Sequence, residues 1–595
     1  MLETNLESRI DAVLDALGDA LQRKDIDAIV ALFEEDGYWR DLLAFTWTLS
    51  TQEGKPAIRA MLESQLEAAA PVSIARDRSE PAITQDGATI GWFLIETALG
   101  RGTGHLRVRD GKIWTLLTTM SELKGHEEPR GTRRALGAPH HSRTVQETWK
   151  EKREREAAEL GYTTQPEVLI IGGGQGGLAL AARLRQLDVP TIVVEKFPRP
   201  GDSWRNRYKS LCLHDPVWYD HMPYLPFPDN WPVYTPKDKI ADWLESYAKT
   251  MELNCWTSTT CKSASYDEAA GEWTVVVERE GVDVVLRPKQ LVFATGMSGK
   301  ASIPTIKGQD VFRGVQQHSS HHAGPDAWKG KKAVVVGSNN SAHDICAALW
   351  ENGADVTMLQ RSSTHVVKSD TLFEMTTSIL YSEKALSEGI TTEKADMRSA
   401  ATPYRLMAEL HKPVYADIRE RDADFYAKLE KAGFMLDFGE DGSGLFMKYM
   451  RRGSGYYIDV GASELIIDGS IKLVSGATIR ELTENGVLLE DGRELPADLI
   501  VYATGYGSMN GWAADLISQE VADKVGPCWG LGSGTTKDPG PWEGEPRNMW
   551  KPTRQPGLWF HGGNLHQSRF YSQYLALQLK ARQEGIPVKV FDGRA

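Results

Sequence analysis

A glycine-rich turn between an apolar strand and a helix constrains this chain more than any other feature. The segment EVLIIGGGQGGLALAARLRQL carries Gly172, Gly174 and Gly177 in the spacing G-x-G-x-x-G, and TIVVEK follows as a second strand ending in Glu195. The first glycine permits a tight turn, the second lets the backbone approach a pyrophosphate, and the third lets helix and strand pack closely. The helix start offers free N–H groups to phosphate, and the carboxylate accepts the ribose hydroxyls. This pattern predicts an α/β dinucleotide-binding domain.

The same strand–loop–helix–strand plan returns at Gly337, in KKAVVVGSNNSAHDICAALW and DVTMLQR. The second loop is degenerate, because Asn339 replaces the middle glycine and Ala342 the last. Its second strand ends in Arg361, with no acidic residue there. A guanidinium at that place suits a 2′-phosphate, which favours NADPH, while a single arginine leaves NADH use open. A surface arginine that merely ends a strand explains Arg361 about as well when it is taken alone.

Two apolar strands end in an Ala-Thr-Gly turn, LVFATG at Gly296 and LIVYATGYG at Gly505. One follows each glycine loop. Such turns let backbone pass beside a cofactor, although an ordinary strand-to-turn junction gives the same pattern. Two dinucleotide sites in one chain are explained most economically by one tightly held flavin and one nicotinamide hydride donor.

Together these motifs resemble a known family. GGGQGG, the GDSW at 201–204, the two ATG segments and Phe312, Gly314 and His318 in an FxGxxxH pattern resemble class B flavoprotein monooxygenases, that is, the flavin-containing and Baeyer–Villiger monooxygenases. The resemblance covers about residues 163 to 595. It implies FAD at the first loop, NADPH at the second, and two Rossmann-like domains of which the second is inserted in the first. His322 replaces the family's last aromatic residue, which is consistent with the type II flavin-containing monooxygenases.

Residues 1–125 form a separate unit in this reading. Three helical stretches, LESRIDAVLDALGDALQRK, DIDAIVALFEE and KPAIRAMLESQLEAA, precede alternating segments with Asp110-Gly111 at a hairpin position. Helices followed by an antiparallel sheet indicate an α+β domain, and the order resembles the cone-shaped nuclear transport factor 2-like fold. Type II flavin-containing monooxygenases carry an N-terminal extension of this sort.

The predicted domain organisation follows from these elements. It comprises the α+β domain at 1–125, a linker and charged helix at 126–163, a first part of the FAD-binding domain at 164–308, an NADP-binding domain at 309–475 with a helical insertion at 370–450, and a second part of the FAD-binding domain at 476–595.

The resemblance also implies an activity. An FAD-dependent NAD(P)H monooxygenase would use a C4a-(hydro)peroxyflavin to insert one atom of O2 into a small organic substrate, by Baeyer–Villiger oxidation of ketones, by sulfoxidation, or by both. The alternatives are type I-like N- or S-oxygenation, an NADPH oxidase that produces H2O2, and a flavin part that is merely structural beside a ligand-binding or dimerising N-terminal domain. A flavin disulfide reductase is disfavoured, because the five cysteines include no CxxC or CxxxxC pair.

Five residues are candidates for catalysis. In YKSLCLHDP, His214 occupies the place where type I members have an asparagine, and Asp215 is the next residue. Arg451 and Arg452 resemble the Lys-Arg pair of Baeyer–Villiger enzymes, in which the cation stabilises the peroxy anion. His318 is expected to hold the linker between the two dinucleotide domains. A core histidine for His214 and a solvated basic turn for the arginines explain these residues nearly as well.

Further contacts are expected from Trp204, beside the flavin, and from GLWFHGGNLHQSRF, whose helix start would face it. The predicted cofactor contacts are Gly172, Gly174, Gly177, Glu195, Trp204, Thr295, Gly296, Gly337, Asn339, Ser341, Arg361, Ser362, Thr504, Gly505, Asn564, Gln567 and Ser568.

Composition narrows the class of partners. With 81 acidic and 68 basic residues the formal charge is −13. Such a chain gains no binding free energy from the release of counterions by nucleic acid, so we do not expect it to bind DNA or RNA. No apolar run approaches the roughly 20 residues of a membrane helix, and MLETNLESRI does not resemble a signal peptide. We expect a cytoplasmic protein that binds O2 and a small molecule and can form a homodimer. No metal site is expected at the histidines 318, 321 and 322, because no acidic or cysteine partner is near.

Overall fold

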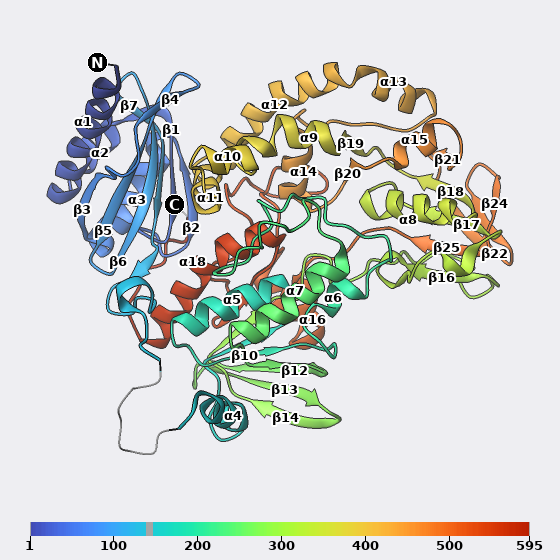
Figure 1. Ribbon diagram of the computed structural model, residues 1–595, viewed down its shortest axis with the longest axis horizontal. Helices are drawn as coiled ribbons and strands as arrows, with labels where there is room; N and C mark the ends of the chain where they lie inside the picture. Colours follow the sequence, from blue (N-terminus) through green and yellow to red (C-terminus); the bar gives the residue numbers. More distant parts are fainter. Residues whose placement is uncertain (1, 138–146, 594–595) are drawn as a thin grey trace.

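The computed structural model describes residues 2–137 and 147–593. An eight-stranded sheet packed with three helices forms the N-terminal domain, at the left of Figure 1. The helices are α1 (Leu2–Arg23), α2 (Ile26–Ala31) and α3 (Gly54–Ala69), and the strands are β1 (Phe33–Leu42), β2 (Leu49–Glu53), β3 (Pro71–Arg76), β4 (Ile83–Gln85), β5 (Ala88–Thr97), β6 (Gly100–Arg109), β7 (Lys112–Thr119) and β8 (Glu122–Leu123). The main path is β2-β1-β7-β6-β5-β3, in which only β1 and β7 run parallel.

The expected α+β domain is confirmed, but the helix expected over DIDAIVALFEE ends early. Asp25 caps α2 by accepting from the Ala28 N–H at 3.0 Å, and the chain becomes strand β1 at Phe33. Sequence analysis missed β1 and β2 because long-range pairing of β1 with β7 overrides local helix propensity. The Asp110-Gly111 hairpin joins β6 and β7 as predicted.

The predicted charged helix is α4 (Trp149–Glu159), which begins with a capping box between Thr148 and Glu151. A short 3-10 turn, η1 (Gly131–Arg133), precedes it, and residues 138–146 of the expected linker lie outside the described residues.

The first α/β unit is built on a parallel sheet in the order β11-β10-β9-β15-β26. Its strands are β9 (Val168–Ile171), β10 (Thr191–Val194), β11 (Cys255–Trp256), β15 (Gln290–Phe293) and β26 (Leu558–Phe560). Its helices are α5 (Gln175–Gln186), α6 (Asp202–Arg205), α7 (Lys237–Thr250), α16 (Asn510–Leu516), α17 (Gln519–Val525) and α18 (Leu565–Gln583), and a side sheet holds β12 (Thr259–Asp267), β13 (Glu272–Arg279) and β14 (Val282–Leu286). The strand order reverses between β9 and β15, and ligands bind at such switch points.

A second parallel sheet has the order β16-β25-β17-β18-β21. It contains β16 (Val315–His318), β17 (Lys332–Val336), β18 (Asp355–Gln360), β21 (Lys472–Ser475) and β25 (Leu499–Tyr502), with η2 (Ser319–His321), η3 (Asp326–Trp328), α8 (Asn340–Glu351), α15 (Ala462–Ile467) and the side strands β22 (Ile479–Thr483), β23 (Gly486–Leu489) and β24 (Glu494–Pro496). The start of one predicted range differs from the structure. The range 476–595 had placed β22 to β25 in the first unit, yet β25 pairs with β16 and β17 of the second sheet, and the side strands β22 to β24 share a core with it.

Between β18 and β21 lies the predicted helical insertion. It comprises β19 (His365–Lys368), α9 (Ser369–Met375), η4 (Thr377–Ile379), α10 (Glu383–Ser387), α11 (Thr392–Ala400), α12 (Tyr404–Arg421), α13 (Ala423–Lys431), α14 (Gly444–Arg452) and β20 (Tyr456–Asp459). Helices α10 and α11 lie beside the N-terminal domain (Figure 1). There Arg107 donates to the Ala401 carbonyl and the Thr402 hydroxyl, each at 3.0 Å.

The chain crosses between the two α/β units in two segments that are bonded to each other. Ala301 and Tyr506 form an antiparallel bridge. The Ser302 N–H donates to the Gly505 carbonyl at 3.0 Å, and the Gly507 N–H donates to the Lys300 carbonyl at 2.9 Å.

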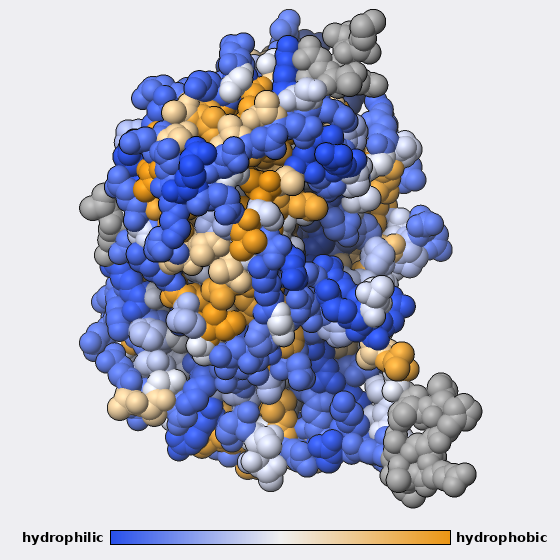
Figure 2. All heavy atoms as spheres, turned by 90° about the vertical axis from the view of Figure 1, so that its left-hand side faces the viewer, coloured by the Kyte–Doolittle hydropathy of each residue, from blue (hydrophilic) through white to orange (hydrophobic). Residues whose placement is uncertain are grey.

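Figure 2 views the molecule from the side of the N-terminal domain, where hydrophilic residues predominate and apolar ones are interspersed. On strands β3 to β5, Val72, Ile83 and Leu94 are large exposed apolar side chains. Among the described helices, none is both long and apolar enough to cross a membrane.

Candidate active site

The three glycines of the first loop differ in their surroundings. Gly172 has φ +113°, and a Cβ on it would lie 2.4 Å from the Ala294 carbonyl oxygen. A Cβ on Gly177 would lie 1.9 Å from the Gly172 carbonyl oxygen, so backbone packing requires both glycines. Around Gly174 the nearest atom to a Cβ is the Ser203 hydroxyl, 3.7 Å away. Packing therefore does not explain Gly174, and the open space over it fits a phosphate group approaching the start of α5.

Glu195 lies against this loop, as the sequence predicts. Its carboxylate accepts from the Gly173 N–H at 2.8 Å and the Phe197 N–H at 2.9 Å. Burial raises the pKa of Glu195, and these two N–H groups oppose that shift. Trp204 donates to the Gln175 side chain at 3.2 Å, and Gln175 donates to the Gly563 carbonyl at 3.1 Å, which joins the loop to the segment before α18.

The N-terminus of α18 faces the first loop. Asn564 and Gln567 form a capping box there, and the space beside Gly176 is bordered by His561, Gly562 and Ser568. The hydroxyls of Ser568 and, in the first ATG turn, Thr295 are buried without a hydrogen-bond partner in the described chain. Because buried polar atoms are normally paired, these two hydroxyls fit a bound group with polar atoms, as FAD has.

The second loop repeats the first in its glycine. Gly337 has φ +133°, and a Cβ on it would lie 2.4 Å from the Ala503 carbonyl oxygen, which copies the relation of Gly172 to Ala294. Asn339 begins α8 without a side-chain cap bond. The nearby Ser341 side chain bonds to Tyr208.

The two predicted contacts beyond the next strand, Arg361 and Ser362, are exposed at the end of β18. In the second ATG turn, Thr504 donates to the Ser302 carbonyl at 2.5 Å.

His318 is buried and links β16 to the second ATG turn. Its Nε2–H donates to the Gly505 carbonyl at 3.0 Å, which leaves Nδ1 to accept from the Ser320 N–H at 3.1 Å. Burial lowers the pKa of His318. His322 is also buried, with Nδ1 2.7 Å from the Gln317 amide nitrogen, and burial lowers its pKa to about 4. Phe312 packs in the core beside these segments.

The structure separates His214 from Asp215. His214 is exposed and lies toward Asp344 of α8, where burial raises the pKa of that carboxyl, and the Tyr208 hydroxyl and His214 oppose the shift. Asp215 lies close enough to Tyr219 to act on its hydroxyl. Burial raises the pKa of Tyr219, and the negative charge of Asp215 raises it further.

Arg451 and Arg452 are the last two residues of α14. The next residue, Gly453, lies close to the first ATG turn, since a Cβ on it would be only 2.6 Å from the Met297 side chain. Both arginines have local partners. Arg451 donates to Asp441 at 2.5 Å, and Arg452 lies 3.7 Å from Glu440. The Arg451 Nε is buried without a partner in the described chain.

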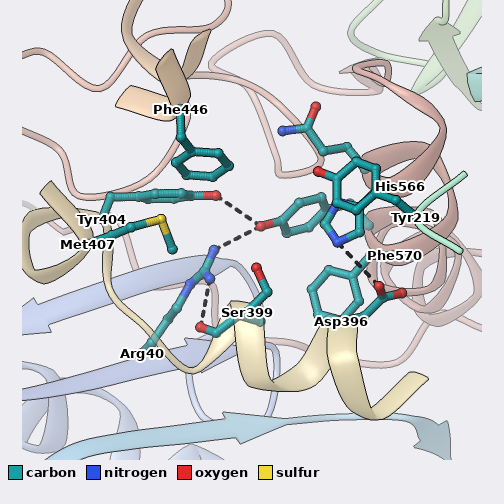
Figure 3. Close-up of a pocket in the computed structure, with 12 residues that line it drawn as sticks. Arg40, Tyr219, Asp396, Ser399, Tyr404, Met407, Phe446, His566 and Phe570 are labelled. Carbon is teal, nitrogen blue, oxygen red and sulfur yellow. Dashed lines mark hydrogen bonds and ion pairs between the residues drawn. The ribbon is translucent and has the colours of Figure 1, made fainter. Parts of the chain in front are cut away.

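A small cavity beside the start of α18 was missed by sequence reasoning (Figure 3). Figure 3 shows Arg40, Met407 and Tyr404 on one side of it and Tyr219 and His566 on the other. Its lining is completed by Asp396, Ser399, Ala400, Phe446, Gln567, Phe570 and Tyr571. These residues come from the N-terminal domain, the insertion and the first α/β unit, so no local motif could reveal the site. Gln567 joins the cavity to the predicted flavin contacts.

Ion pairs support the cavity wall. Arg569 binds Asp396 through two bonds of 2.8 Å, and Nε2 of His566 lies 3.3 Å from the same carboxylate. Burial alone would raise the pKa of Asp396, but Arg569 and His566 outweigh it and hold that pKa well below its usual range. The His566 ring stacks on Tyr219 with centroids 4.4 Å apart.

Comparisons with known proteins agree with this arrangement. The family model described as pyridine nucleotide-disulphide oxidoreductase matches residues 169–409, and a SnoaL-like domain model matches residues 14–116. Indole-3-pyruvate monooxygenase YUCCA1 of Oryza sativa subsp. japonica is 30% identical over 374 residues, 62% of this chain and 84% of that protein. Probable indole-3-pyruvate monooxygenase YUCCA10 of Arabidopsis thaliana is 30% identical over 352 residues, 58% of this chain and 84% of that protein.

Among solved structures, an open crystal structure of cyclohexanone monooxygenase covers 71% of this chain and 88% of its own, with a TM-score of 0.51 and 19% identity. That likeness concerns the fold alone. The five cysteines of the chain, Cys212, Cys255, Cys261, Cys346 and Cys528, are free in this structure.

Proposed function

This chain belongs to the flavin-containing monooxygenase family, and from that membership we propose that it binds FAD at the first loop and NADPH at the second. One atom of O2 is transferred to a small organic substrate. The reaction consumes substrate, O2, NADPH and one proton, and yields the oxygenated product, NADP+ and water. The observation that carries the proposal is the pair of loops, each with its first glycine against the carbonyl of an ATG turn.

The residues of the first site have distinct tasks in this proposal. Gly174 leaves room for the pyrophosphate, and Glu195 lies where a carboxylate accepts ribose hydroxyls. Bound FAD supplies electron transfer from NADPH and activation of O2. Thr295 and Ser568 offer their unpartnered hydroxyls to it, and the positive end of the α18 dipole favours negative charge beside it.

At the second loop, Arg361 is the candidate that reads the 2′-phosphate, and its exposure leaves it accessible to the nucleotide. NADH remains a second donor in this proposal, because a single arginine carries the preference.

The proposed reactions are Baeyer–Villiger oxidation of ketones and sulfoxidation. Arg451 supports the first, since it lies near the first ATG turn with a free Nε and can stabilise an anion that develops there. The ion pair between Arg451 and Asp441 reduces the net positive charge that Arg451 offers to such an anion. Sulfoxidation needs less stabilisation of an anion, and it is therefore the second proposed reaction.

The test starts from purified protein supplied with FAD, NADPH and ¹⁸O2. Cyclic ketones and thioethers are the probes, and mass spectrometry follows incorporation of one labelled atom into a lactone or a sulfoxide. The expected result is labelled product coupled to NADPH consumption. Stoichiometric H2O2 without labelled product would instead identify an oxidase, and a protein that takes up no FAD would refute the proposal entirely.

A further inference from the structure

Helix α14 of the insertion is bonded to the start of α18 through one tyrosine. The Tyr449 hydroxyl donates to the side-chain oxygen of Gln567 at 2.5 Å, and it accepts from the Asn564 backbone N–H at 3.3 Å. The Trp529 indole N–H donates to the Tyr449 carbonyl at 2.8 Å, and the two rings meet edge to face with centroids 5.2 Å apart. The backbone and the ring of Tyr449 are therefore held in place, and its hydroxyl lies at the N-terminus of α18.

These contacts decide which way the Gln567 amide faces. Its oxygen accepts from two donors, the Tyr449 hydroxyl and the Asn564 N–H, the latter at 3.3 Å. Its nitrogen has only the thioether sulfur of Met450, 3.6 Å away. Turning the amide over would set its NH2 group against the Asn564 N–H, so that two donors would face each other. The amide oxygen is therefore fixed toward Tyr449, and the NH2 group faces away from it.

The NH2 group of Gln567 lacks a strong acceptor within the described chain. Gln567 is only 4% exposed, and a thioether is a weak acceptor for a group that carries two N–H donors. Buried donors are normally paired, so this one has room for a further partner. Gln567 stands on the segment that contacts the first loop, because Gly563, four residues before it, accepts from Gln175 at 3.1 Å. FAD has carbonyl oxygens and ring nitrogens that can accept such a bond.

We propose that Gln567 donates a hydrogen bond from its amide nitrogen to bound FAD, and that Tyr449 is the positioning residue that keeps this donor in place. The inference rests on the proposed function, which places FAD at the first loop. Tyr449 acts through Gln567 and not on FAD itself. Because α14 ends in Arg451 and Arg452, the same hydroxyl also ties the arginine pair to the start of α18.

Substitutions of Gln567 test the donor. Gln567→Leu removes the amide, and Gln567→Glu keeps the length and an oxygen for Tyr449 but replaces the NH2 group by a second oxygen. We expect the Kd for FAD to rise at least about 10-fold in Gln567→Leu, and further in Gln567→Glu, in which an oxygen faces the acceptor. Flavin fluorescence during titration of the deflavinated protein measures this. FAD affinity that is unchanged in Gln567→Leu would overturn the proposal. If Gln567→Leu does not fold, Gln567→Met takes its place.

A matched pair of tyrosine variants tests the positioning role. Tyr426, on α13 of the same insertion, donates its hydroxyl to the Val366 carbonyl at 3.1 Å, a bond that involves no residue of α18. Tyr449→Phe and Tyr426→Phe each lose one hydroxyl bond and should lose similar thermal stability. Only Tyr449→Phe should raise the Kd for FAD, by about 5-fold, and shift the visible absorption bands of the bound flavin. Equal effects of the two variants on FAD would show a general loosening of the insertion and would overturn the positioning role.

A double variant shows whether Tyr449 acts through Gln567. In a protein that already carries Gln567→Leu, no amide is left to orient. Adding Tyr449→Phe should then change the Kd for FAD by less than about 2-fold, so the two single effects should not add. Effects that add in full would mean that Tyr449 influences FAD by another route, which would contradict the role proposed for it.

The unmodified protein separates this inference from the proposed function. Uptake of FAD and its reduction by NADPH report on the proposed function alone. If the unmodified protein takes up FAD and NADPH reduces it, while the variants of Gln567 and Tyr449 bind FAD equally well, only the inference is wrong. If the unmodified protein takes up no FAD, or NADPH does not reduce it, the proposed function itself is wrong.

Discussion

Gly174 and Gly177 belong to one motif, yet their surroundings predict opposite results for the same substitution. Gly174→Ala should fold normally, since its φ of −79° suits any residue and nothing lies within 3.4 Å of the new Cβ, but FAD binding should weaken at least about 10-fold. Gly177→Ala should destabilise the fold by about 3 kcal/mol or more, because its Cβ would overlap the Gly172 carbonyl. Flavin absorbance and thermal unfolding distinguish the two. Full FAD affinity in Gly174→Ala would argue against a pyrophosphate at this loop.

Arg361 is the residue on which the choice of nucleotide depends. It is exposed, and no ion pair to it is found within residues 2–137 and 147–593. Arg361→Ala should raise KM for NADPH by about 10- to 100-fold, the range expected for charge-assisted bonds to phosphate, and should leave KM for NADH nearly unchanged. Steady-state kinetics with both nucleotides checks this. Equal effects on both would show that Arg361 does not read the 2′-phosphate.

His343 makes the stability of the second unit dependent on pH. Its ring stacks on Tyr457 with centroids 3.8 Å apart, and burial lowers its pKa to about 4. Below about pH 6.5, His343 of the unfolded chain binds a proton, whereas His343 of the folded chain stays neutral down to about pH 4. The free energy of unfolding therefore decreases as the pH is lowered from about 6.5 to about 4, by up to about 1.4 kcal/mol per pH unit. Thermal unfolding at pH 7 and pH 5 should show a smaller difference for His343→Gln. An identical difference would contradict this account.

At the scale of elements, the His318 side chain links the end of β16 to the second ATG turn. His318→Ala removes the bond to the Gly505 carbonyl, and we expect less product per NADPH consumed while the protein keeps its flavin. His321→Ala, at an exposed neighbouring position, is the control. Product yield, H2O2 and flavin content are measured together. Loss of FAD from His318→Ala would assign this histidine a purely structural role.

Elements whose signal is local could be predicted, and those that depend on distant pairing could not. The glycine spacing and the flanking apolar runs indicated both α/β units, because a phosphate loop needs its strand and helix adjacent in sequence. Strand β25 shows the limit. Its run LIVY indicates a buried strand, but nothing in four apolar residues says which sheet it joins.

The site follows the same division. Asp396 lies in EKADMRSA, which reads as the charged face of a surface helix, and its role appears only when Arg569 and His566 meet it from α18. In the sequence, Arg40 looks like an ordinary charged residue, and only the structure shows Glu545 paired with it. The assignments of the cofactor contacts, of the arginine pair and of a homodimer stay predictions.

At the scale of the whole molecule, the N-terminal domain is held by a buried ion pair. The side chains of Arg40 and Glu545 are 2% and 0% exposed. Arg40→Met should destabilise the protein by about 3–5 kcal/mol, because it leaves Glu545 buried without a partner, and Arg40→Met with Glu545→Met should recover much of that loss. Denaturation of the three proteins checks this. A double variant no more stable than Arg40→Met would show that the charge is not the cause.

The paired crossing between the α/β units restricts how those units can move. Two separate connections would allow the two units to slide and twist against each other. Segments 300–302 and 505–507 are instead hydrogen-bonded into one short two-stranded ribbon. We expect such a ribbon to bend perpendicular to its face and to resist sliding of one segment along the other. Gly505 lies in that ribbon, and its carbonyl accepts a hydrogen bond from His318 Nε2–H. His318 therefore ties β16 to this ribbon, and we expect any opening between the two α/β units to bend at Gly505.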